Sequence, residues 1–276
     1  MSTEADHTYD IVVVGSGSAG FATALGAVDE GLSVLIVEST DKWGGSTAMS
    51  GGGMWMPNNP LMQRDGVGDS REEALAYLEA TVGDEGAATT RARKEAFVDG
   101  VEDFVDGVED FVTTAERFGV VFARATDYPD YYPELPGGKI GRSIGVKPLS
   151  SKILGEHWDT LRNAIPLPAM TNDVWLLGRA WSTVSGMIRG AQVVGRIAGG
   201  VVTGRRLVGI GNAWATAFCK AVVIDSNVPL WLNSPLEELV VEGGRVVGIR
   251  VTHEGKTVTV RANRGVLIAG GGVEAN

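Results

Sequence analysis

The hydrophobic pattern at the start of the chain consists of short apolar runs separated by an amphipathic segment. Residues 11–14 and 33–37 are almost wholly apolar and rich in Val and Ile, as is typical of parallel strands that are buried on both faces. Residues 21–30 carry apolar side chains at helical spacing, and Gly31 follows them as a glycine commonly follows a helix. This order predicts a βαβ unit on a parallel sheet.

The middle of the chain follows a helical pattern. Apolar residues recur at three- and four-residue spacing over residues 71–82 and 91–119, and residues 173–224 form an apolar region interrupted by glycines. Residues 98–104 and 105–111 are identical copies of one heptad. Because seven residues make about two helical turns, the duplication preserves the apolar face. We predict that the repeat lengthens one helix.

A β-rich segment follows the helical region. Strands are expected at residues 230–232, 238–242, 245–253, 257–261 and 266–269. The dipeptide Gly243-Gly244 between two of them is a hairpin signal. The predicted fold class is therefore α/β. One Rossmann-like domain over residues 1–276 would contain a mainly helical insertion over residues 63–225 and a β-rich hairpin unit.

The turn after the first strand has the glycine spacing of a dinucleotide-binding loop. Gly15 permits a tight turn, Gly17 lets the backbone approach a pyrophosphate, and Gly20 lets the next helix pack closely on the sheet. Glu38 ends the second strand, about 20 residues after the third glycine, where a carboxylate accepts hydrogen bonds from a ribose and repels a 2′-phosphate. The predicted binding residues of this part are Gly15, Ser16, Gly17, Ser18, Ala19, Gly20, Glu38 and Ser39.

A second glycine-rich run points to FAD rather than NAD. Its glycines leave bare backbone that can lie against a flat ring system and donate main-chain N–H groups to it. The large apolar neighbours Trp43 and Trp55 argue against a flexible linker. The predicted binding residues of this run are Gly44, Gly45, Ser46, Thr47, Ser50, Gly51, Gly52 and Gly53.

These motifs resemble those of a flavoprotein family that includes fumarate reductase and the 3-ketosteroid dehydrogenases. The segments that carry the resemblance are residues 10–20, Glu38, 44–59, 128–138, Gly141-Arg142, 234–241 and 264–272. Residues 55–59 and 128–138 are similar to the steroid branch in particular. The resemblance adds Val240, Ala269 and Gly270 to the predicted FAD site. FAD is expected to be bound non-covalently, because no histidine lies near residues 44–53.

The resemblance to the steroid branch also implies a reaction. FAD would accept a hydride from one carbon of a ring C–C bond, while a base takes a proton from the neighbouring carbon beside a keto group. The family match assigns Tyr131 to this site, where its phenol would donate to that base or relay the proton. The substrate would be a small molecule, a 3-ketosteroid, and an external acceptor would receive the electrons.

Two alternatives stay open. A dicarboxylate reductase of the fumarate type would bind its substrate through Arg and His clusters of a capping domain. A non-catalytic flavin-binding fragment, or a subunit completed by another chain, would carry the same glycine motifs. In the resembled family a capping domain and a return segment follow the strand that ends at Ala269 and Gly270, so we expect this chain to be incomplete.

The charge of the chain is negative and unevenly distributed. The net charge is −10; residues 1–140 hold 9 basic and 25 acidic residues, and residues 141–276 hold 15 and 9. The acidic first part argues against a nucleic-acid partner. Five arginines between residues 179 and 206 either form a membrane-touching surface or are solvated and paired. We favour the second interpretation.

The cysteine and histidine content restricts the remaining chemistry. Cys219 is the only cysteine, so we expect no internal disulfide, a buried core thiol and a cytoplasmic protein. His7, His157 and His253 are scattered, which predicts neither a metal site nor a Ser-His-Asp triad. Residues 1–8 lack the apolar segment of a signal peptide, and the longest uncharged run is too short to span a bilayer.

Overall fold

The computed structural model describes residues 5–102, 111–162 and 167–272. The chain divides into two compact units, and each is described by itself. The first unit contains residues 1–50, 149–166 and 211–276, and the second contains residues 51–148 and 167–210. The second unit holds most of the segment 63–225, whose assignment as a helical insertion in one domain stays a prediction.

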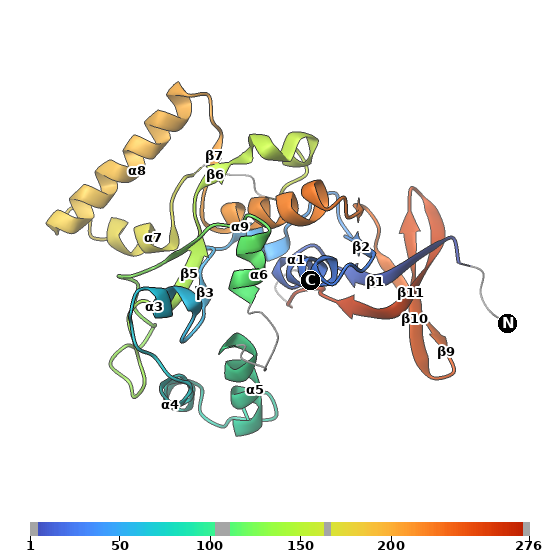
Figure 1. Cartoon of the computed structure of the whole chain (residues 1–276), viewed down its shortest axis with the longest axis horizontal. Coiled ribbons are helices and arrows are strands. Elements are labelled where there is room, and N and C mark those ends of the chain that lie inside the picture. Colours follow the sequence, from blue (N-terminus) through green and yellow to red (C-terminus); the bar gives the residue numbers. More distant parts are fainter. Residues whose placement is uncertain (1–4, 103–110, 163–166, 273–276) are drawn as a thin grey trace. The chain divides into compact units, whose positions relative to one another are not determined.

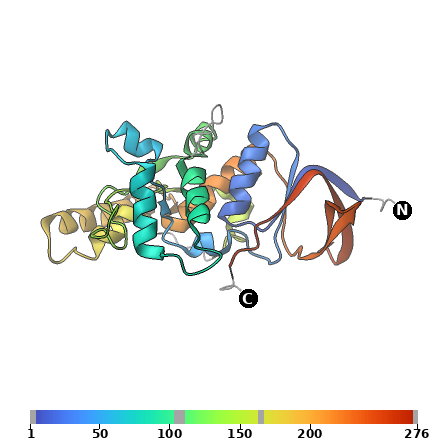
Figure 2. The same cartoon turned by 90° about the horizontal axis from the view of Figure 1, so that it is seen from below.

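The first unit is built on a six-stranded sheet with the strand order β8-β2-β1-β11-β10-β9 (Figure 1). The strands are β1 (His7–Val14), β2 (Val34–Val37), β8 (Leu230–Trp231), β9 (Leu236–Glu242), β10 (Arg245–His253) and β11 (Lys256–Ile268). β1 is parallel to β2 and β11, and β2 is parallel to β8. β10 is antiparallel to β9 and β11 (Figure 2). The predicted α/β fold is confirmed.

Strand β11 is continuous where the sequence predicts two strands, over residues 257–261 and 266–269. Its pairing with β1 shifts in register, since Tyr9 lies opposite Ala262 whereas Ile11 lies opposite Gly265. A bulge of this kind absorbs extra residues without ending a strand. One strand therefore belongs both to the hairpin unit and to the parallel part of the sheet.

Helix α1 (Ser18–Asp29) follows the glycine loop and begins three residues before its predicted start. Its residues Phe21, Ala24 and Leu25 are fully buried. The other elements of this unit are α2 (Gly45–Met49), β6 (Leu149–Ser150), the 3₁₀ segment Ser151–Trp158, most of α9 (Ile210–Cys219) and the π-helical segment Lys220–Asp225. Helix α2 occupies part of the second glycine run, for which the sequence analysis predicted bare backbone but no helix. A run rich in Ser, Thr and Ala after the glycines can complete a helical turn, and the glycine pattern did not reveal this.

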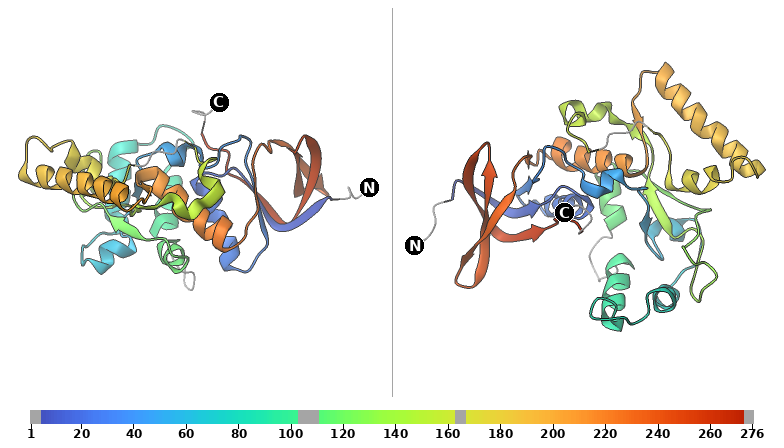
Figure 3. Two further views of the ribbon diagram at one scale, coloured as in Figure 1. Left: turned by 90° about the horizontal axis from the view of Figure 1, so that it is seen from above. Right: turned by 180° about the vertical axis from the view of Figure 1, so that it is seen from behind.

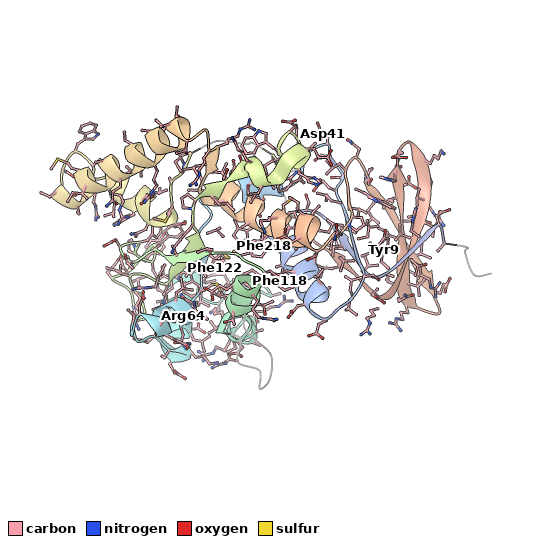
Figure 4. The ribbon with its side chains drawn as sticks, turned by 45° about the horizontal axis from the view of Figure 1, so that its top comes forward. Tyr9, Asp41, Arg64, Phe118, Phe122 and Phe218 are labelled. Atoms are coloured by element: carbon pink, nitrogen blue, oxygen red, sulfur yellow. The ribbon has the colours of Figure 1, made fainter. Side chains whose placement is uncertain are left out.

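The core of the sheet is an apolar cluster contributed by both halves of the chain. Its buried members are Val12, Leu35, Val37, Ile249, Val251, Val260 and Ala262. Tyr9 of β1 packs against this cluster (Figure 4). In α9, the rings of Trp214 and Phe218 stack at 3.9 Å. Cys219 is fully buried, and burial raises the pKa of its thiol to about 12. The predicted core role of this cysteine is confirmed.

The second unit contains a small antiparallel sheet and most of the helices. Its elements are β3 (Met54–Trp55), α3 (Pro60–Arg64), α4 (Arg71–Val82), α5 (Arg91–Glu102), α6 (Phe111–Arg117), β4 (Phe122–Arg124), β5 (Ser143–Val146), α7 (Thr171–Leu177), α8 (Val184–Val202) and β7 (Leu207–Val208). The sheet order is β3-β5-β4. Arg64 of α3 donates two hydrogen bonds to Glu116 of α6, at 2.9 and 2.8 Å (Figure 4).

The predicted helices of the middle region are found, with interruptions. α4 has the predicted bounds, and α5 and α6 lie within the predicted helix over residues 91–119. Residues 103–110, which hold most of the heptad repeat, lie outside the described residues. α7 and α8 lie side by side (Figure 3). In the described part of the chain, no helix has the length and apolar character needed to cross a membrane.

Candidate functional site

The glycine loop after β1 places Ser16 where three segments meet. Ser16 is fully buried, and its N–H and hydroxyl donate to Glu38 Oε2 at 3.2 and 2.6 Å. Its Oγ accepts a hydrogen bond from the Gly44 N–H at 3.1 Å. The serine between two loop glycines therefore joins the first loop, the end of β2 and the second glycine run.

The carboxylate of Glu38 is 8% exposed and is oriented by its neighbours. Its second oxygen, Oε1, lies 3.1 Å from the Thr40 N–H and 3.2 Å from the hydroxyls of Ser39 and Thr40. The single hydroxyl proton of Thr40 has a shorter contact, 2.8 Å, with the Lys42 carbonyl oxygen. Because that proton is directed to Lys42, Oε1 keeps acceptor capacity for a further hydroxyl.

Two glycines of the first loop are required by packing within the protein. Gly15 has a φ of +107°, and a Cβ there would lie 2.3 Å from the Ala269 carbonyl oxygen. The Ala269 N–H in turn donates to the Val14 carbonyl oxygen at 2.7 Å. A Cβ on Gly20 would lie 2.0 Å from the carbonyl oxygen of Gly15. Any side chain at either position would push the loop or α1 away from the sheet.

Packing within the protein does not require glycine at two other positions, Gly17 and Gly270. The space at these positions therefore shows whether a dinucleotide can fit there. A Cβ on Gly17 would approach only Thr47 Oγ1, at 3.8 Å, and a Cβ on Gly270 would meet nothing within 4 Å. Bare backbone at these points leaves room for a bulky group. The first N–H groups of α1, which have no acceptor within the helix, suit a phosphate. The residues present therefore fit the pyrophosphate and ribose of FAD.

The second glycine run is anchored to the first loop and to α9. Ser18 N–H donates to Thr47 Oγ1 at 3.0 Å. The side chain of Asn212, in α9, donates to the Ala48 carbonyl oxygen at 2.6 Å, and Gly211 N–H donates to the Ser50 carbonyl oxygen at 3.1 Å. Asn212 was not predicted as part of the site. The apolar run around it gave no signal, because its partner lies 164 residues away.

Gly51, Gly52 and Gly53 belong to the second unit, where Gly51 and Gly53 contact Thr171. A Cβ on Gly53 would lie 2.9 Å from Thr171 Cγ2. Thr171 Oγ1 donates to the Gly51 carbonyl oxygen at 3.3 Å. A Cβ on Gly145 of β5 would lie 3.3 Å from the Gly52 carbonyl oxygen. These contacts explain, by packing within the protein, why this part of the run is rich in glycine. The roles of Gly51, Gly52, Gly53 and the exposed Ser46 in FAD binding stay predictions.

The structure does not bring Val240 together with the other predicted site residues. It lies in β9 opposite Gly248, and β10 and β11 separate its strand from β1. Ser234, which lies just before β9, contacts the end of β2, because its N–H donates to the Glu38 carbonyl oxygen at 2.8 Å. Ser234 Oγ also lies 2.8 Å from His253 Nδ1. Sequence analysis missed Ser234, because the strand pattern alone does not say which end of the hairpin meets β2.

Tyr131 lies in a loop of the second unit with its side chain open to solvent. It is 84% exposed, whereas Tyr128 packs edge-on against Trp175 with a centroid distance of 5.9 Å. Burial and the neighbouring Tyr131 phenol raise the pKa of Tyr128. The exposure of Tyr131 does not favour a pure packing role for this side chain.

A buried ionic network holds the loop that carries Tyr131. Arg142 is fully buried and donates to Asp69 through Nε and Nη2, at 2.9 and 2.8 Å, and to Asp130 through Nη1 at 2.9 Å. Asp130 Oδ1 accepts from the Trp55 indole N–H at 2.8 Å, and Oδ2 accepts from the Lys139 N–H at 3.0 Å. The residue next to Tyr131 in the sequence is therefore fixed by three partners.

The charge state of Asp69 is set by this network. Burial alone would raise the pKa of Asp69, but hydrogen bonds from Arg142 and the Asn58 N–H, together with the charges of Arg142 and Lys139, lower it to about 2. Burial opposes the charge on Arg142 as well, and its carboxylate partners Asp69 and Asp130 nevertheless raise the pKa of Arg142. Nothing in the sequence pairs Asp69 with Arg142, 73 residues apart, so the network was not predicted.

Three arginines of the basic segment, between residues 179 and 206, have partners in the structure. Arg189 lies 3.3 Å from Asp173, and Arg196 also forms an ion pair with Asp173, whose side chain is fully buried. Arg179 lies over the ring of Trp175 at 4.1 Å. The favoured interpretation of paired arginines is confirmed for Arg189 and Arg196. Among the described residues, no group of three or more His, Cys, Asp or Glu side chains could hold a metal ion.

Comparison with known proteins identifies the family. The family model "FAD binding domain" matches residues 10–276. The 3-oxosteroid 1-dehydrogenase of Mycolicibacterium smegmatis is 37% identical over 97% of this chain and 47% of its own length. The 4-oxocyclohex-2-ene-1-carboxylate 5-dehydrogenase of Sinomonas cyclohexanicum is 33% identical over 97% of this chain and 45% of its own.

The solved structures agree with these relatives. The 3-ketosteroid Δ1-dehydrogenase of Sterolibacterium denitrificans, crystallised with 1,4-androstadiene-3,17-dione, aligns with a TM-score of 0.80 and 33% identity, over 98% of this chain and 49% of that chain. The chain thus spans about half the length of the relatives it matches. The predicted resemblance and the prediction of FAD are confirmed, whereas non-covalent attachment stays a prediction. The match over residues 10–276, on a fold whose glycine loop fits a dinucleotide, shows that the chain belongs to the FAD binding domain family.

Proposed function

We propose that this chain forms the FAD-binding part of a dehydrogenase that introduces a double bond beside a ring ketone, with a 3-ketosteroid as substrate. The observation that carries the proposal is the 37% identity with the M. smegmatis 3-oxosteroid 1-dehydrogenase, because it extends over 97% of the chain rather than over the glycine motifs alone. The S. denitrificans structure, which contains a steroid dienedione, supports the same substrate class.

The residues of the first unit would bind the cofactor. FAD, when bound, supplies the hydride acceptor of this reaction. Glu38 would accept hydrogen bonds from ribose hydroxyls through Oε1, and the backbone at Gly17 and the N-terminus of α1 would bind the pyrophosphate. Ser16 would hold Glu38 and Gly44 in place before the cofactor arrives, which lowers the cost of ordering these loops on binding.

In the second unit, Tyr131 would take part in the proton transfer. Its phenolic oxygen would donate to, or relay a proton from, the base that deprotonates the carbon beside the ketone. Such a group must be accessible to its partner, and Tyr131 is 84% exposed beside the fixed Asp130. General acid–base catalysis of this kind contributes about 10²–10⁴-fold. An external acceptor would receive the electrons, and a cytoplasmic location stays an expectation.

The alternatives differ in substrate, so a substrate comparison tests the proposal. We would join this chain to the remaining half of the M. smegmatis relative and measure dye reduction with a 3-ketosteroid and with 4-oxocyclohex-2-ene-1-carboxylate, the compound named for the S. cyclohexanicum relative. Fumarate would be tested in the reductive direction. Activity with the ketosteroid is expected. Activity with only one of the other two compounds would overturn the steroid assignment. A fusion that binds FAD stoichiometrically and oxidises or reduces none of them would favour a non-catalytic flavin-binding role.

The tyrosine assignment needs a matched pair of variants in the same fusion. Tyr131→Phe should lower the turnover number by about 10²-fold or more, whereas the neighbouring Tyr132→Phe should retain it. The reverse result would move the role by one residue. Equal activity of both variants would remove this loop from the proton transfer.

A further inference from the structure

Both sequence neighbours of Tyr131 are held by side chains from other elements of the second unit. On one side, the carboxylate of Asp130 accepts from Arg142, from the Trp55 indole N–H and from a backbone N–H. On the other side, the N–H of Tyr132 donates to the phenolic oxygen of Tyr77 at 3.1 Å. Tyr77 belongs to α4 and lies 55 residues earlier in the chain. The exposed tyrosine is therefore bracketed by two anchored residues.

The hydroxyl of Tyr77 is an unusual group for its surroundings. Tyr77 is only 7% exposed. Its ring centroid lies 5.9 Å from that of Trp55, and the guanidinium carbon of Arg142 lies 5.9 Å from the Tyr77 centroid. A phenylalanine would fill the same place in this cluster without an oxygen, and a buried hydroxyl costs free energy unless it forms a hydrogen bond. The contact with the Tyr132 N–H accounts for a tyrosine at this position.

The loop that carries Tyr131 is packed tightly against α4. A Cβ on Gly137 would lie 2.1 Å from the Glu73 carbonyl oxygen and 2.7 Å from the Tyr77 nitrogen. The loop contains three prolines, Pro129, Pro133 and Pro136. Each proline ring fixes one backbone φ angle. The backbone around Tyr131 therefore has few alternative conformations, although the Tyr131 side chain itself is 84% exposed.

We propose that Tyr77 is a positioning residue for Tyr131. Its phenolic oxygen holds the peptide group between Tyr131 and Tyr132 in one orientation, and this orientation fixes the direction in which the Tyr131 side chain leaves the loop. A catalytic group that is already oriented avoids the cost of ordering during the reaction, and a displacement of about 1 Å can lower the rate by about 10²-fold. The inference rests on the role proposed above for Tyr131.

The test compares single and double variants in the fusion protein described above. Tyr77→Phe removes one oxygen and keeps the ring, so the aromatic cluster stays filled. It should lower kcat for the 3-ketosteroid by about tenfold and change KM by less than about twofold, because orientation of a reacting group acts on the transition state rather than on substrate binding. In the Tyr131→Phe background the same change should cause no further loss, since the residue that it positions is absent.

Tyr9→Phe is the matched control. Tyr9 packs against the core of the first unit, and its hydroxyl has no assigned role in the reaction. This variant should retain both kcat and KM. Circular dichroism and urea unfolding of all variants would separate a loss of stability from a loss of orientation.

Hydrogen exchange measures the same contact without substrate. In Tyr77→Phe the peptide that covers residues 128–138 should exchange its amide protons about tenfold faster, because the Tyr132 N–H has lost its acceptor. Peptides from α1 should be unchanged. The two measurements together connect the hydrogen bond with the reaction.

Three results would overturn the proposal. They are an unchanged exchange rate in residues 128–138, an equal loss of kcat from Tyr77→Phe in the presence and absence of the Tyr131 phenol, and a rise in KM at constant kcat. Full turnover of Tyr131→Phe would instead overturn the proposed function of Tyr131, and the exchange rate would show separately whether Tyr77 fixes the loop.

Discussion

Replacement of Asp69 by Asn tests whether the buried network under the tyrosine loop stabilises the second unit. The substitution keeps the shape of the side chain but removes its charge. In the wild-type chain the carboxylate accepts from two nitrogens of Arg142 and from the Asn58 N–H, and its side chain is fully buried. In the variant, Arg142 keeps only Asp130 as a charged partner. We expect a loss of stability that depends on pH.

The magnitude follows from the pKa of Asp69. It lies at about 2 in the folded chain against an ordinary value of 3.8, and a difference of about 1.8 units corresponds to about 2.4 kcal/mol. Because the folded-state pKa is lowered, this stabilisation is fully present above pH 3.8 and is lost as the pH falls through 2. At pH 3 about half of it, roughly 1.3 kcal/mol, should remain.

Urea unfolding followed by circular dichroism measures this difference. At pH 7 the free energy of unfolding of Asp69→Asn should be lower than that of the wild type by about 2 kcal/mol or more, and the gap should narrow at pH 3. The control is Asp65→Asn, whose half-exposed side chain pairs with Arg124 and whose loss should cost less than about 1 kcal/mol. A gap that stays constant or widens as the pH falls would refute the reasoning.

Three further predictions concern the first unit. Gly17→Ala should leave the free energy of unfolding nearly unchanged but weaken FAD binding, which flavin fluorescence measures. Gly20→Ala should instead destabilise the fold, because its Cβ would lie 2.0 Å from a backbone oxygen. Equal effects of the two variants on stability and on FAD binding would contradict this prediction. Glu38→Ala should cost roughly 1–3 kcal/mol of FAD affinity, and an unchanged dissociation constant would remove Glu38 from the site. Acid precipitation of the wild-type protein should release the flavin, because the flavin is expected to be bound non-covalently. Cys219, with a pKa of about 12, should react with iodoacetamide at pH 8 only after unfolding, and rapid labelling of the folded chain would disprove its burial.

The features that the sequence predicted correctly depend on local signals. The parallel strands follow from apolar runs bounded by glycine, and the Gly243-Gly244 hairpin follows from two residues that both adopt positive φ, +57° and +78°. The bounds of α4 follow from helical periodicity and from Ser70, whose side chain caps the helix by accepting from the Glu73 N–H. Each of these features is determined by residues that are close together in the sequence, so the local sequence is sufficient to predict it.

The features that the sequence missed depend on contacts between distant residues. The pairing of Arg142 with Asp69 spans 73 residues, and the anchoring of α2 by Asn212 spans 164. The position of Val240 in the outer strand depends on strand order, which periodicity does not specify.

Some glycines near the predicted cofactor site are required by the fold, whereas others are not and are better explained by a ligand. Gly15 and Gly20 would be needed in a protein that bound nothing, because a Cβ at either position would overlap backbone atoms. A Cβ on Gly17 would make only an ordinary contact with Thr47 Oγ1, at 3.8 Å, and a Cβ on Gly270 would meet nothing within 4 Å. Packing therefore does not explain why these two residues lack side chains. Ser16 contributes in a third way, since its hydroxyl bonds to Glu38 and Gly44 and orients groups that would contact the cofactor. The physical case for a dinucleotide therefore depends on the two unconstrained glycines and on the free acceptor capacity of Glu38, and the glycine spacing alone would not establish it.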